Sequence, residues 1–205
     1  DTGKPWQVDA GLANGRVFLL MASCGFDAEV VDRFHARRQG PIRRWHYGRP
    51  IWEMIRSYQY PPLRLYCDGV EAETDASWLF LFNLPCYAAR LRFVPQASGT
   101  DGKLDYCAFH RGSFWHGVRY LSHLAFGRHQ ELADCDVGTF RTMRIESDLP
   151  VAYQLDGDPG GRLPLDVSVL PGRVRLLTPP EFAAIGPTTN VAVEAPSDEA
   201  PTRAQ

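Results

Sequence analysis

The amino-acid sequence predicts an α+β fold, mainly antiparallel β, in which a β-sandwich carries short helices. About nine short apolar segments have the length of strands, and most of them follow one another without a helix between them. The apolar spacing also changes from a helical period to a period of two after Pro61-Pro62. The 205 residues, of which 44% are hydrophobic and 22% charged, are enough for one domain with a sizeable core.

The first part of the chain combines apolar runs with helix and turn signals. Val17 to Cys24 is an almost continuous apolar run, which predicts one buried strand. Gly25 ends this run, and Asp27 stands where a helix N-cap would, ahead of a predicted helix from Ala28 to Arg38. A second helix is predicted over Arg49 to Tyr58, where apolar residues recur at helical spacing.

The rest of the chain is mostly strand-like. A third helix is predicted from Ser113 to about Gly127, with an apolar stripe of Phe114, Val118, Leu121 and Ala125. The remaining predicted strands cover Leu63–Cys67, Trp78–Asn83, Arg90–Val94, Leu104–His110, Thr139–Ile145, Val151–Leu155, Leu163–Val169 and Val174–Leu177. Residues 1–180 are therefore expected to form the folded domain, and residues 181–205, rich in Pro, Ala, Thr and acids, a disordered acidic tail.

Charge is unevenly distributed along the chain. The net charge of −2 gives no reason to expect nucleic acid as a partner. Arg33 to Arg64 holds eight Arg and one acid, which is either a solvated face or a surface for anionic lipid or phosphate. No apolar run approaches the ~18 residues of a membrane span. We therefore expect a cytoplasmic location, with the inner membrane face as a possible peripheral site.

The five cysteines, Cys24, Cys67, Cys86, Cys107 and Cys135, form no CxxC pair. An odd number without pairing argues against a disulfide scaffold or a zinc site, and it suits a reducing compartment. The six histidines show no HExxH spacing, and the chain contains neither GxGxxG nor a P-loop.

Three segments have residue types that could support chemistry. In Ser23-Cys24-Gly25-Phe26-Asp27, a glycine between a buried strand and a helix allows close approach to a ligand, although a plain strand–helix turn has the same spacing. Asn83 is followed by Pro95 to Asp105, where an Asp-Gly with free neighbouring carbonyls could hold a hard cation or simply form a turn.

The third segment is Gln154-Leu155-Asp156-Gly157-Asp158. Two carboxylates flank a glycine at the end of a strand, so one could take a proton from a hydroxyl while the other orients it or holds Mg²⁺. As an isolated match, the same pentapeptide is more often a hairpin turn.

Taken in order, these segments are similar to the C-terminal domain of the diacylglycerol kinase catalytic family, which includes bacterial diacylglycerol kinases and sphingosine and ceramide kinases. The matching segments are Phe18–Val30, Asn83, Pro95–Leu104, Gln154–Asp158 and Leu177-Thr178-Pro179, so the likeness covers residues 8–180.

The resemblance implies a lipid-kinase β-sandwich, with an absent N-terminal nucleotide-binding domain as partner. By this resemblance, Asp156 is the general base. Asp158 is the second acid of the motif, at a position where the family usually has Glu. Gly25 and Asn83 become candidate cofactor-binding residues. It also implies a Mg²⁺ site in which Asp101 offers its side chain and Ser98 and Lys103 offer carbonyl oxygens.

The implied reaction transfers phosphate from ATP to the hydroxyl of a diacylglycerol- or sphingosine-like lipid. ATP would be held mostly by the missing domain, so this chain alone is expected to be inactive. The expected partners are the lipid substrate and a membrane surface. A homodimer is an alternative to a monomer. The alternative is a non-catalytic lipid- or membrane-binding module of the same fold, using the Arg33–Arg64 stretch with Trp45 and Trp52.

Overall fold

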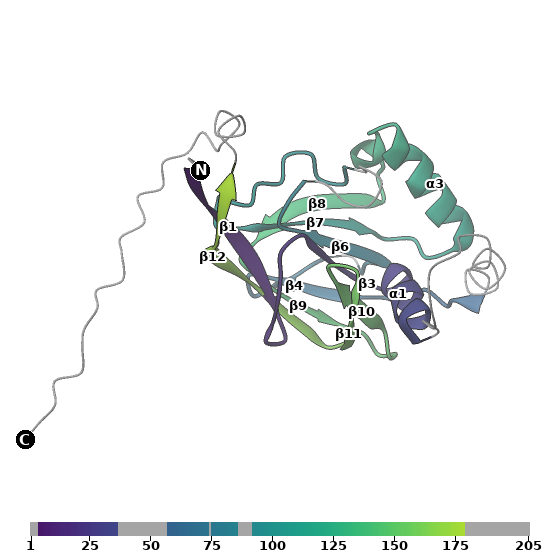
Figure 1. Cartoon of the computed structure of the whole chain (residues 1–205). Helices are drawn as coiled ribbons and strands as arrows, with labels where there is room; N and C mark the ends of the chain where they lie inside the picture. The colour runs from purple at the N-terminus through teal and green to yellow at the C-terminus, as the bar shows by residue number, and fades with distance from the viewer. Residues whose placement is uncertain (1–3, 37–56, 74, 86–91, 179–205) are drawn as a thin grey trace, which may run out of the picture.

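The computed structural model describes residues 4–36, 57–73, 75–85 and 92–178. These residues form two antiparallel sheets packed face to face (Figure 1). The first sheet has the order β2 (Arg16–Phe18), β1 (Lys4–Ala13), β12 (Leu165–Thr178), β9 (Thr142–Glu146), β4 (Arg64–Cys67) and β5 (Val70–Glu71). The second has the order β11 (Asp158–Arg162), β10 (Ala152–Leu155), β3 (Met21–Cys24), β6 (Trp78–Phe82), β7 (Leu104–Phe109) and β8 (Cys135–Phe140). The predicted fold class is confirmed.

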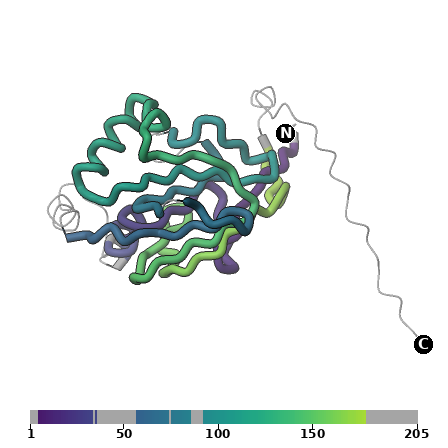
Figure 2. Tube along the Cα trace, turned by 180° about the vertical axis from the view of Figure 1, so that it is seen from behind, coloured from purple at the N-terminus to yellow at the C-terminus, as the bar shows by residue number. Residues whose placement is uncertain are grey.

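The main core lies between the two sheets. Its largest fully buried side chains include Phe18, Phe140, Leu79 and Ile145. The Phe18 ring lies against Gly11, its partner in the strand pairing, and fills the space that a side chain at position 11 would occupy. β1 and β12, from opposite ends of the chain, lie side by side in both views (Figures 1 and 2).

Two helices cover parts of the second sheet. Helix α1 (Phe26–Ala36) lies against β3, β10 and β11. Helix α3 (Phe114–Ala125) begins at Ser113, whose hydroxyl accepts a hydrogen bond from the His116 N–H, and a short 3-10 turn, η3 (His129–Glu131), follows it. A second apolar cluster, which includes Phe80, Phe93, Phe109, Tyr120 and Leu124, fills the space between α3 and the sheet.

The prediction of one strand over Val17–Cys24 is wrong. The chain leaves the first sheet at Phe18 and enters the second at Met21, and Leu19 and Leu20 between them are 42% and 47% exposed. The physical reason is local hydrogen bonding, because the N–H groups of this bend donate to the Asp156 carboxylate instead of to a strand. An apolar run therefore does not prove one continuous strand.

Two other strand predictions are corrected at similar corners. Thr139–Ile145 is not one strand, because β8 ends at Phe140 and β9 begins in the other sheet at Thr142. The N–H groups of Arg141 and Thr142 donate to the side chain of Asp68 at this corner. Conversely, the two strands predicted over Leu163–Val169 and Val174–Leu177 form one strand, β12, which begins only at Leu165 and bulges opposite Asp9.

Smaller differences concern element ends. Helix α1 begins at Phe26, so Asp27 lies in its first turn and not at its N-cap. Arg92 to Val94 is a loop, in which Phe93 and Val94 are buried without strand partners. Strand β11 was not predicted. Three predictions fall mostly or wholly outside the described residues. They are the helix over Arg49–Tyr58, of which only the last two residues are described, most of the Arg33–Arg64 stretch with Trp45 and Trp52, and the tail over residues 181–205.

Candidate functional site

The segment Leu155 to Asp158 is the tight hairpin that joins β10 to β11. Asp156 has φ +51° and Gly157 φ +89°, which is the backbone of a two-residue turn with Asp-Gly at its centre. The structural reading of this motif as a turn is therefore correct, and the question is what its two carboxylates do.

The Asp156 carboxylate is bound by backbone N–H groups. Oδ2 accepts from Leu19 at 2.7 Å, and Oδ1 accepts from Leu20 at 2.8 Å and from Met21 at 2.9 Å. The Asp156 N–H in turn donates to the Met21 carbonyl at 2.9 Å. Since a carboxylate has about four acceptor positions, these bonds occupy most of them.

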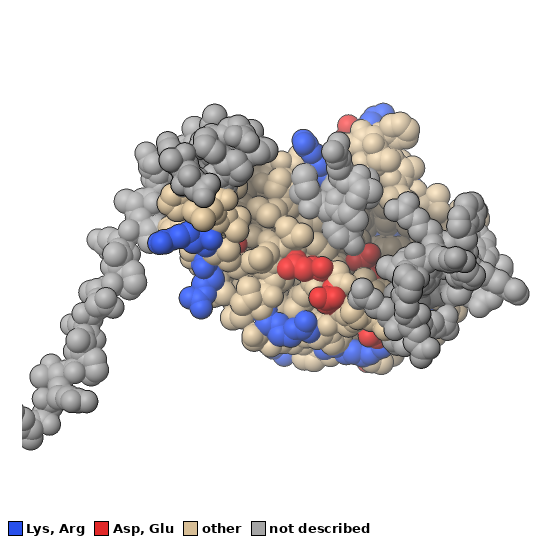
Figure 3. Space-filling view, viewed as in Figure 1, with Lys and Arg blue, Asp and Glu red and all other residues tan. Residues whose placement is uncertain are grey.

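The Asp158 carboxylate lies in a different setting. Its side chain is 67% exposed, and Oδ1 lies 3.2 Å from the His35 Nε2 of helix α1. The face in Figure 3 has acidic side chains gathered over the region where β3, β10 and α1 meet in Figure 1. Both acids of the motif are exposed, and they differ because only Asp156 is bound by these three backbone N–H groups.

A chain of hydrogen bonds links this turn to the first turn of helix α1. The Gly157 N–H donates to Gln154 Oε1 at 2.7 Å, and Gln154 Nε2 donates to Ser23 Oγ at 2.9 Å. The Ser23 hydroxyl then donates to Asp27 Oδ2 at 2.7 Å. Gln154 and Ser23 are fully buried, so the chain fixes Asp27 relative to the hairpin.

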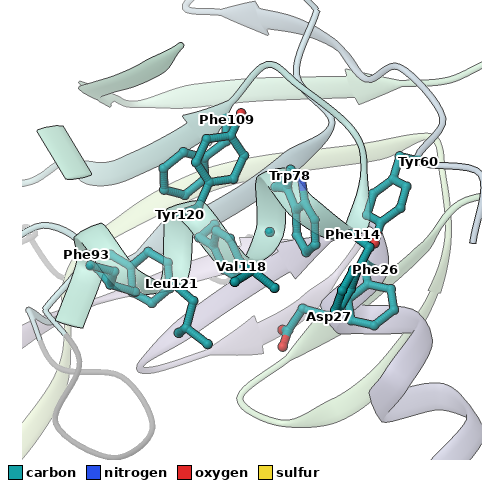
Figure 4. Close-up of a pocket in the computed structure, with 13 residues that line it drawn as sticks. Phe26, Asp27, Tyr60, Trp78, Phe93, Phe109, Phe114, Val118, Tyr120 and Leu121 are labelled. Carbon is teal, nitrogen blue, oxygen red and sulfur yellow. The ribbon is translucent and has the colours of Figure 1, made fainter. Parts of the chain in front are cut away.

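Asp27 lies at an apolar pocket between α1, α3 and the second sheet, with a volume of about 430 Å³ (Figure 4). The other lining residues are aromatic, aliphatic or glycine: Phe26, Tyr60, Trp78, Phe80, Phe93, Phe109, Phe114, Gly117, Val118, Tyr120, Leu121 and Leu124. Among the described residues that line the pocket, Asp27 carries the only charge. Figure 4 shows Val118 and Leu121 pointing toward the same space as Asp27.

The predicted apolar stripe of helix α3 is partly corrected by this pocket. Tyr120 and Leu124 are the buried residues of the helix, while Val118 and Leu121 are 45% and 57% exposed. Phe114, Val118 and Leu121 of the stripe face an open pocket instead of a closed core, and Ala125 does not line it.

Gly25 has a structural explanation. Its φ of +102° is unfavourable for other residues, and a side chain there would press on the Ser77 carbonyl at 3.3 Å. Its N–H donates to Ala152 and its carbonyl accepts from Glu29. The residue turns the chain from β3 into α1 and so positions Ser23 and Asp27.

The residues from Ser98 to Asp105, a loop followed by the start of β7, form a second polar region. Asp101 Oδ1 accepts from the Lys103 N–H at 3.1 Å, and the Ser98 hydroxyl lies 3.2 Å from that of Thr100. Asp9, buried in β1, accepts from the Gly102 N–H at 2.8 Å and from the Gly172 N–H at 2.6 Å. Asp9 was not among the predicted site residues.

Asn83 and Asp105 lie next to this loop. Asn83 Nδ2 donates to the carbonyls of Asp9 and Leu19 at 2.7 and 2.9 Å. Burial, together with the nearby Asp101 carboxylate, raises the pKa of Asp105 to about 6. Within the described part of the chain, Asn83 Oδ1 and Asp105 Oδ2 are buried oxygens without a hydrogen-bond partner.

These two oxygens are chemically suited to a hard cation, which binds carboxylate and carbonyl oxygen. The described residues contain no cluster of three or more His, Cys, Asp and Glu side chains that could hold a metal. A cation bound here would therefore also need backbone oxygens as ligands.

Sequence reasoning missed the pocket and its carboxylate. The aromatic residues come from helices, strands and loops between Phe26 and Leu124, and no short spacing connects them. Asp27 was taken only as a helix cap. The signal that could have singled it out is its spacing of four from Ser23, which brings the two side chains together where β3 runs into α1.

Cys24, Cys67, Cys107 and Cys135 are free among the described residues, and the Sγ atoms of Cys107 and Cys135 lie 3.8 Å apart. In the same part of the chain, no helix is both long and apolar enough to cross a membrane.

Residues 21–178 match the family model described as "YegS C-terminal NAD kinase beta sandwich-like domain". The chain belongs to this family. The match begins at β3 and ends with β12, so it includes the hairpin, the pocket and the Ser98–Asp105 loop.

Two bacterial diacylglycerol kinases are similar to this chain in sequence. A diacylglycerol kinase of Mycobacterium tuberculosis (strain CDC 1551 / Oshkosh) is 29% identical over 163 residues, which is 79% of this chain and 52% of the relative. A diacylglycerol kinase of Staphylococcus aureus (strain JH9) is 22% identical over 177 residues, 86% of this chain and 56% of the relative. This member of the YegS C-terminal family thus spans little more than half the length of these relatives.

A solved structure has the same fold. The crystal structure of a diacylglycerol kinase from Bacillus anthracis strain Sterne superposes with a TM-score of 0.58 at 15% identity, covering 87% of this chain and 56% of that one.

Proposed function

We propose that the chain is the substrate-binding and catalytic half of an ATP-dependent kinase that phosphorylates a lipid hydroxyl. The observation that carries the proposal is the apolar pocket with a single carboxylate, connected through buried hydrogen bonds to the hairpin with two acids. Family membership and the names of the relatives point the same way.

The pocket suits the apolar part of such a substrate. Its volume of about 430 Å³ and its aromatic wall are typical of sites that bury a hydrocarbon group. A lipid chain placed there would leave its polar end near Asp27, where the carboxylate could accept a hydrogen bond from a hydroxyl. Asp27 would thereby orient the headgroup with respect to the hairpin.

The hairpin supplies two carboxylates, either of which could act as the base that takes the proton from the lipid hydroxyl. The resemblance assigns the base to Asp156, whose acceptor positions are mostly taken by three N–H donors. Asp158 is open to solvent and lies two residues along, so it is the second candidate. We propose that the pair works together, with Asp156 fixing the turn and at least one of the two taking the proton.

We further propose a Mg²⁺ ion at the Ser98–Asp105 loop. Asp101 would bind through its side chain and Ser98 and Lys103 through their carbonyls, beside the unpartnered oxygens of Asn83 and Asp105. The ion would neutralise the buried Asp105 and hold the loop in place. ATP would be bound mainly by a nucleotide-binding domain outside this chain.

The test is an assay of phosphate transfer from ATP to diacylglycerol and to sphingosine with the whole protein that contains this chain. We expect Asp158→Asn and Asp156→Asn each to lower kcat at least about 100-fold with lipid binding retained. A variant with near-wild-type turnover would remove that residue from the base role. Absence of transfer to either lipid by the wild-type protein would refute the kinase proposal for these substrates.

The alternative is a lipid-binding module without catalysis. It is favoured by the hydrogen bonds of Asp156, which give this residue a structural role that needs no reaction. In that case the pocket binds a fluorescent diacylglycerol analogue, and the whole wild-type protein transfers no phosphate from ATP to a lipid.

A further inference from the structure

Helix α3 has an outward face that is apolar. Trp115 is 75% exposed, Val118 is 45% exposed, and Phe126 at the C-cap is 81% exposed. Together with Ser122, these residues are spaced three or four apart, which places them on one side of the helix. A single exposed apolar residue needs no explanation, but neighbouring large ones indicate a contact surface.

The chemistry around this face is basic. Between Tyr106 and Gln130 the sequence contains three Arg and four His and no Asp or Glu. The three Arg side chains, Arg111, Arg119 and Arg128, are 67%, 41% and 68% exposed. The carboxylates that meet them come from just outside, since Asp134 lies 3.8 Å from Arg111 and 2.9 Å from Arg119, and Glu131 lies 2.9 Å from Arg128. Two described carboxylates thus face three guanidinium groups, and a third, Asp136, lies 2.8 Å from the ring of His110.

The outward face is continuous with the pocket. Val118 and Leu121 line the pocket and are also 45% and 57% exposed. The same helix therefore offers apolar side chains to the outside and to the cavity, with no charged residue of α3 between them in the pocket lining.

We propose that this face of α3, defined by Trp115, Val118, Ser122 and Phe126, docks on an anionic lipid bilayer. Trp115 and Phe126 enter the interface, where aromatic side chains are favoured, and the arginines lie at the level of the phosphate groups. The lipid passes between the bilayer and the pocket along Val118 and Leu121. This last step rests on the proposed lipid kinase function, whereas the docking itself does not.

A bilayer fits this surface better than a protein partner does. The face is a helical stripe with aromatic anchors, surrounded by Arg and His and without acids of its own, which is the pattern of an interfacial helix. An apolar substrate also gains from a pocket that opens at the membrane, because its chain does not have to cross water.

The test is co-sedimentation of the whole protein with vesicles of phosphatidylcholine and phosphatidylglycerol. We expect Trp115→Ala with Phe126→Ala to lower the partition coefficient about tenfold. The matched control is Val70→Ala with Leu177→Ala, which removes apolar side chains that are 70% and 77% exposed on the other sheet. Equal binding of the two double variants would overturn the proposal and leave the α3 face as a contact for protein.

A second variant separates loss of vesicle binding from loss of folding. Ser122→Glu places an acid between Trp115 and Phe126 on an exposed position, and we expect it to weaken binding to anionic vesicles with an unchanged melting temperature. Binding that is unaffected by this charge would also count against docking. On a water-soluble short-chain lipid, the Trp115→Ala/Phe126→Ala variant should retain its activity. Failure of the kinase proposal would therefore appear in that assay and not in the sedimentation.

Discussion

At the scale of single residues, the Asp156 carboxylate determines where the chain changes sheets. It accepts hydrogen bonds from the N–H groups of Leu19 and Leu20, which lie between β2 and β3, and of Met21, the first residue of β3. A hairpin acid is thereby a structural part of a bend more than 130 residues earlier in the chain. Any loss of activity on changing Asp156 thus needs to be separated from a loss of stability.

We expect Asp156→Ala to lower the free energy of unfolding by about 2 kcal/mol, because three N–H groups lose a charged acceptor while water replaces part of the bonding. Asp158→Ala should cost less than about 0.5 kcal/mol, since the side chain it removes is largely exposed. Urea denaturation of both variants measures the difference. Equal stability of the two would contradict the anchoring role of Asp156.

A second residue-scale prediction concerns pH. The pKa of Asp105 is raised to about 6, so the folded chain binds this proton more tightly than the unfolded chain does. The associated stability is fully present below the unfolded pKa of about 4 and is lost as the pH rises to 6.

Asp105→Asn removes this dependence. Relative to the wild type, we expect the variant to gain about 2–3 kcal/mol between pH 4 and pH 7. The measurement is urea denaturation at both pH values in the presence of a chelator. With Mg²⁺ added at pH 7, the wild type should recover stability and the variant should recover less. A flat difference between the two pH values would rule out Asp105 as the titrating group.

At the scale of elements, helix α3 packs against the second sheet and also forms part of the pocket lining. Gly117 allows this close approach, because a side chain at this position would meet the Trp78 ring at 2.8 Å. Tyr120 stacks on Phe109 with ring centroids 4.3 Å apart and holds the helix on the sheet. The volume of the pocket therefore depends on small and large residues of one helix.

Gly117→Leu is expected to displace the Trp78 ring, which the new side chain would meet, and so to change the apolar wall of the pocket. In the whole protein, the KM for a long-chain lipid should rise at least about tenfold, while the KM for ATP stays unchanged, because the substitution lies in the apolar wall. Kinetics with long-chain and short-chain substrates measure this. An unchanged KM for the long-chain lipid would place the chain of the substrate elsewhere.

At the scale of the whole molecule, helix α1 connects the hairpin with the pocket, because it packs against β10 and β11 and also lines the pocket with Phe26 and Asp27. The sequence supplies no P-loop or GxGxxG for a nucleotide. The relatives, of which the matched residues cover 52% and 56%, have room for a further domain.

We therefore expect residues 1–205 alone to transfer no phosphate from radiolabelled ATP to diacylglycerol, since positioning of ATP is the main requirement of this chemistry. The whole protein is the positive control. Transfer by the isolated chain at a comparable rate would show that it holds ATP by itself.

Sequence reasoning was most successful where the cause is local. Leu104–His110 and the helix from Ser113 were predicted from apolar spacing, and the structure has β7 and α3 within one or two residues of these bounds. It failed at corners. Val17–Cys24 and Thr139–Ile145 each divide between two sheets, because Asp156 and Asp68 bind the backbone at the break. Asp156 and Asp68 bind backbone N–H groups that are 136 and 73 residues away in the sequence, and a contact between such distant residues leaves no periodic pattern.

The sequence by itself determined the fold class, the family resemblance and the Asp-Gly turn, because strand period, turn residues and motif order are properties of short segments. Only the tertiary structure decided that Asp156 is bound to the β2–β3 bend, that Asp27 is linked to the hairpin, and that scattered aromatic residues enclose one pocket. Those features arise from strand pairing and packing between residues far apart in the chain, and local spacing contains no information about such distances.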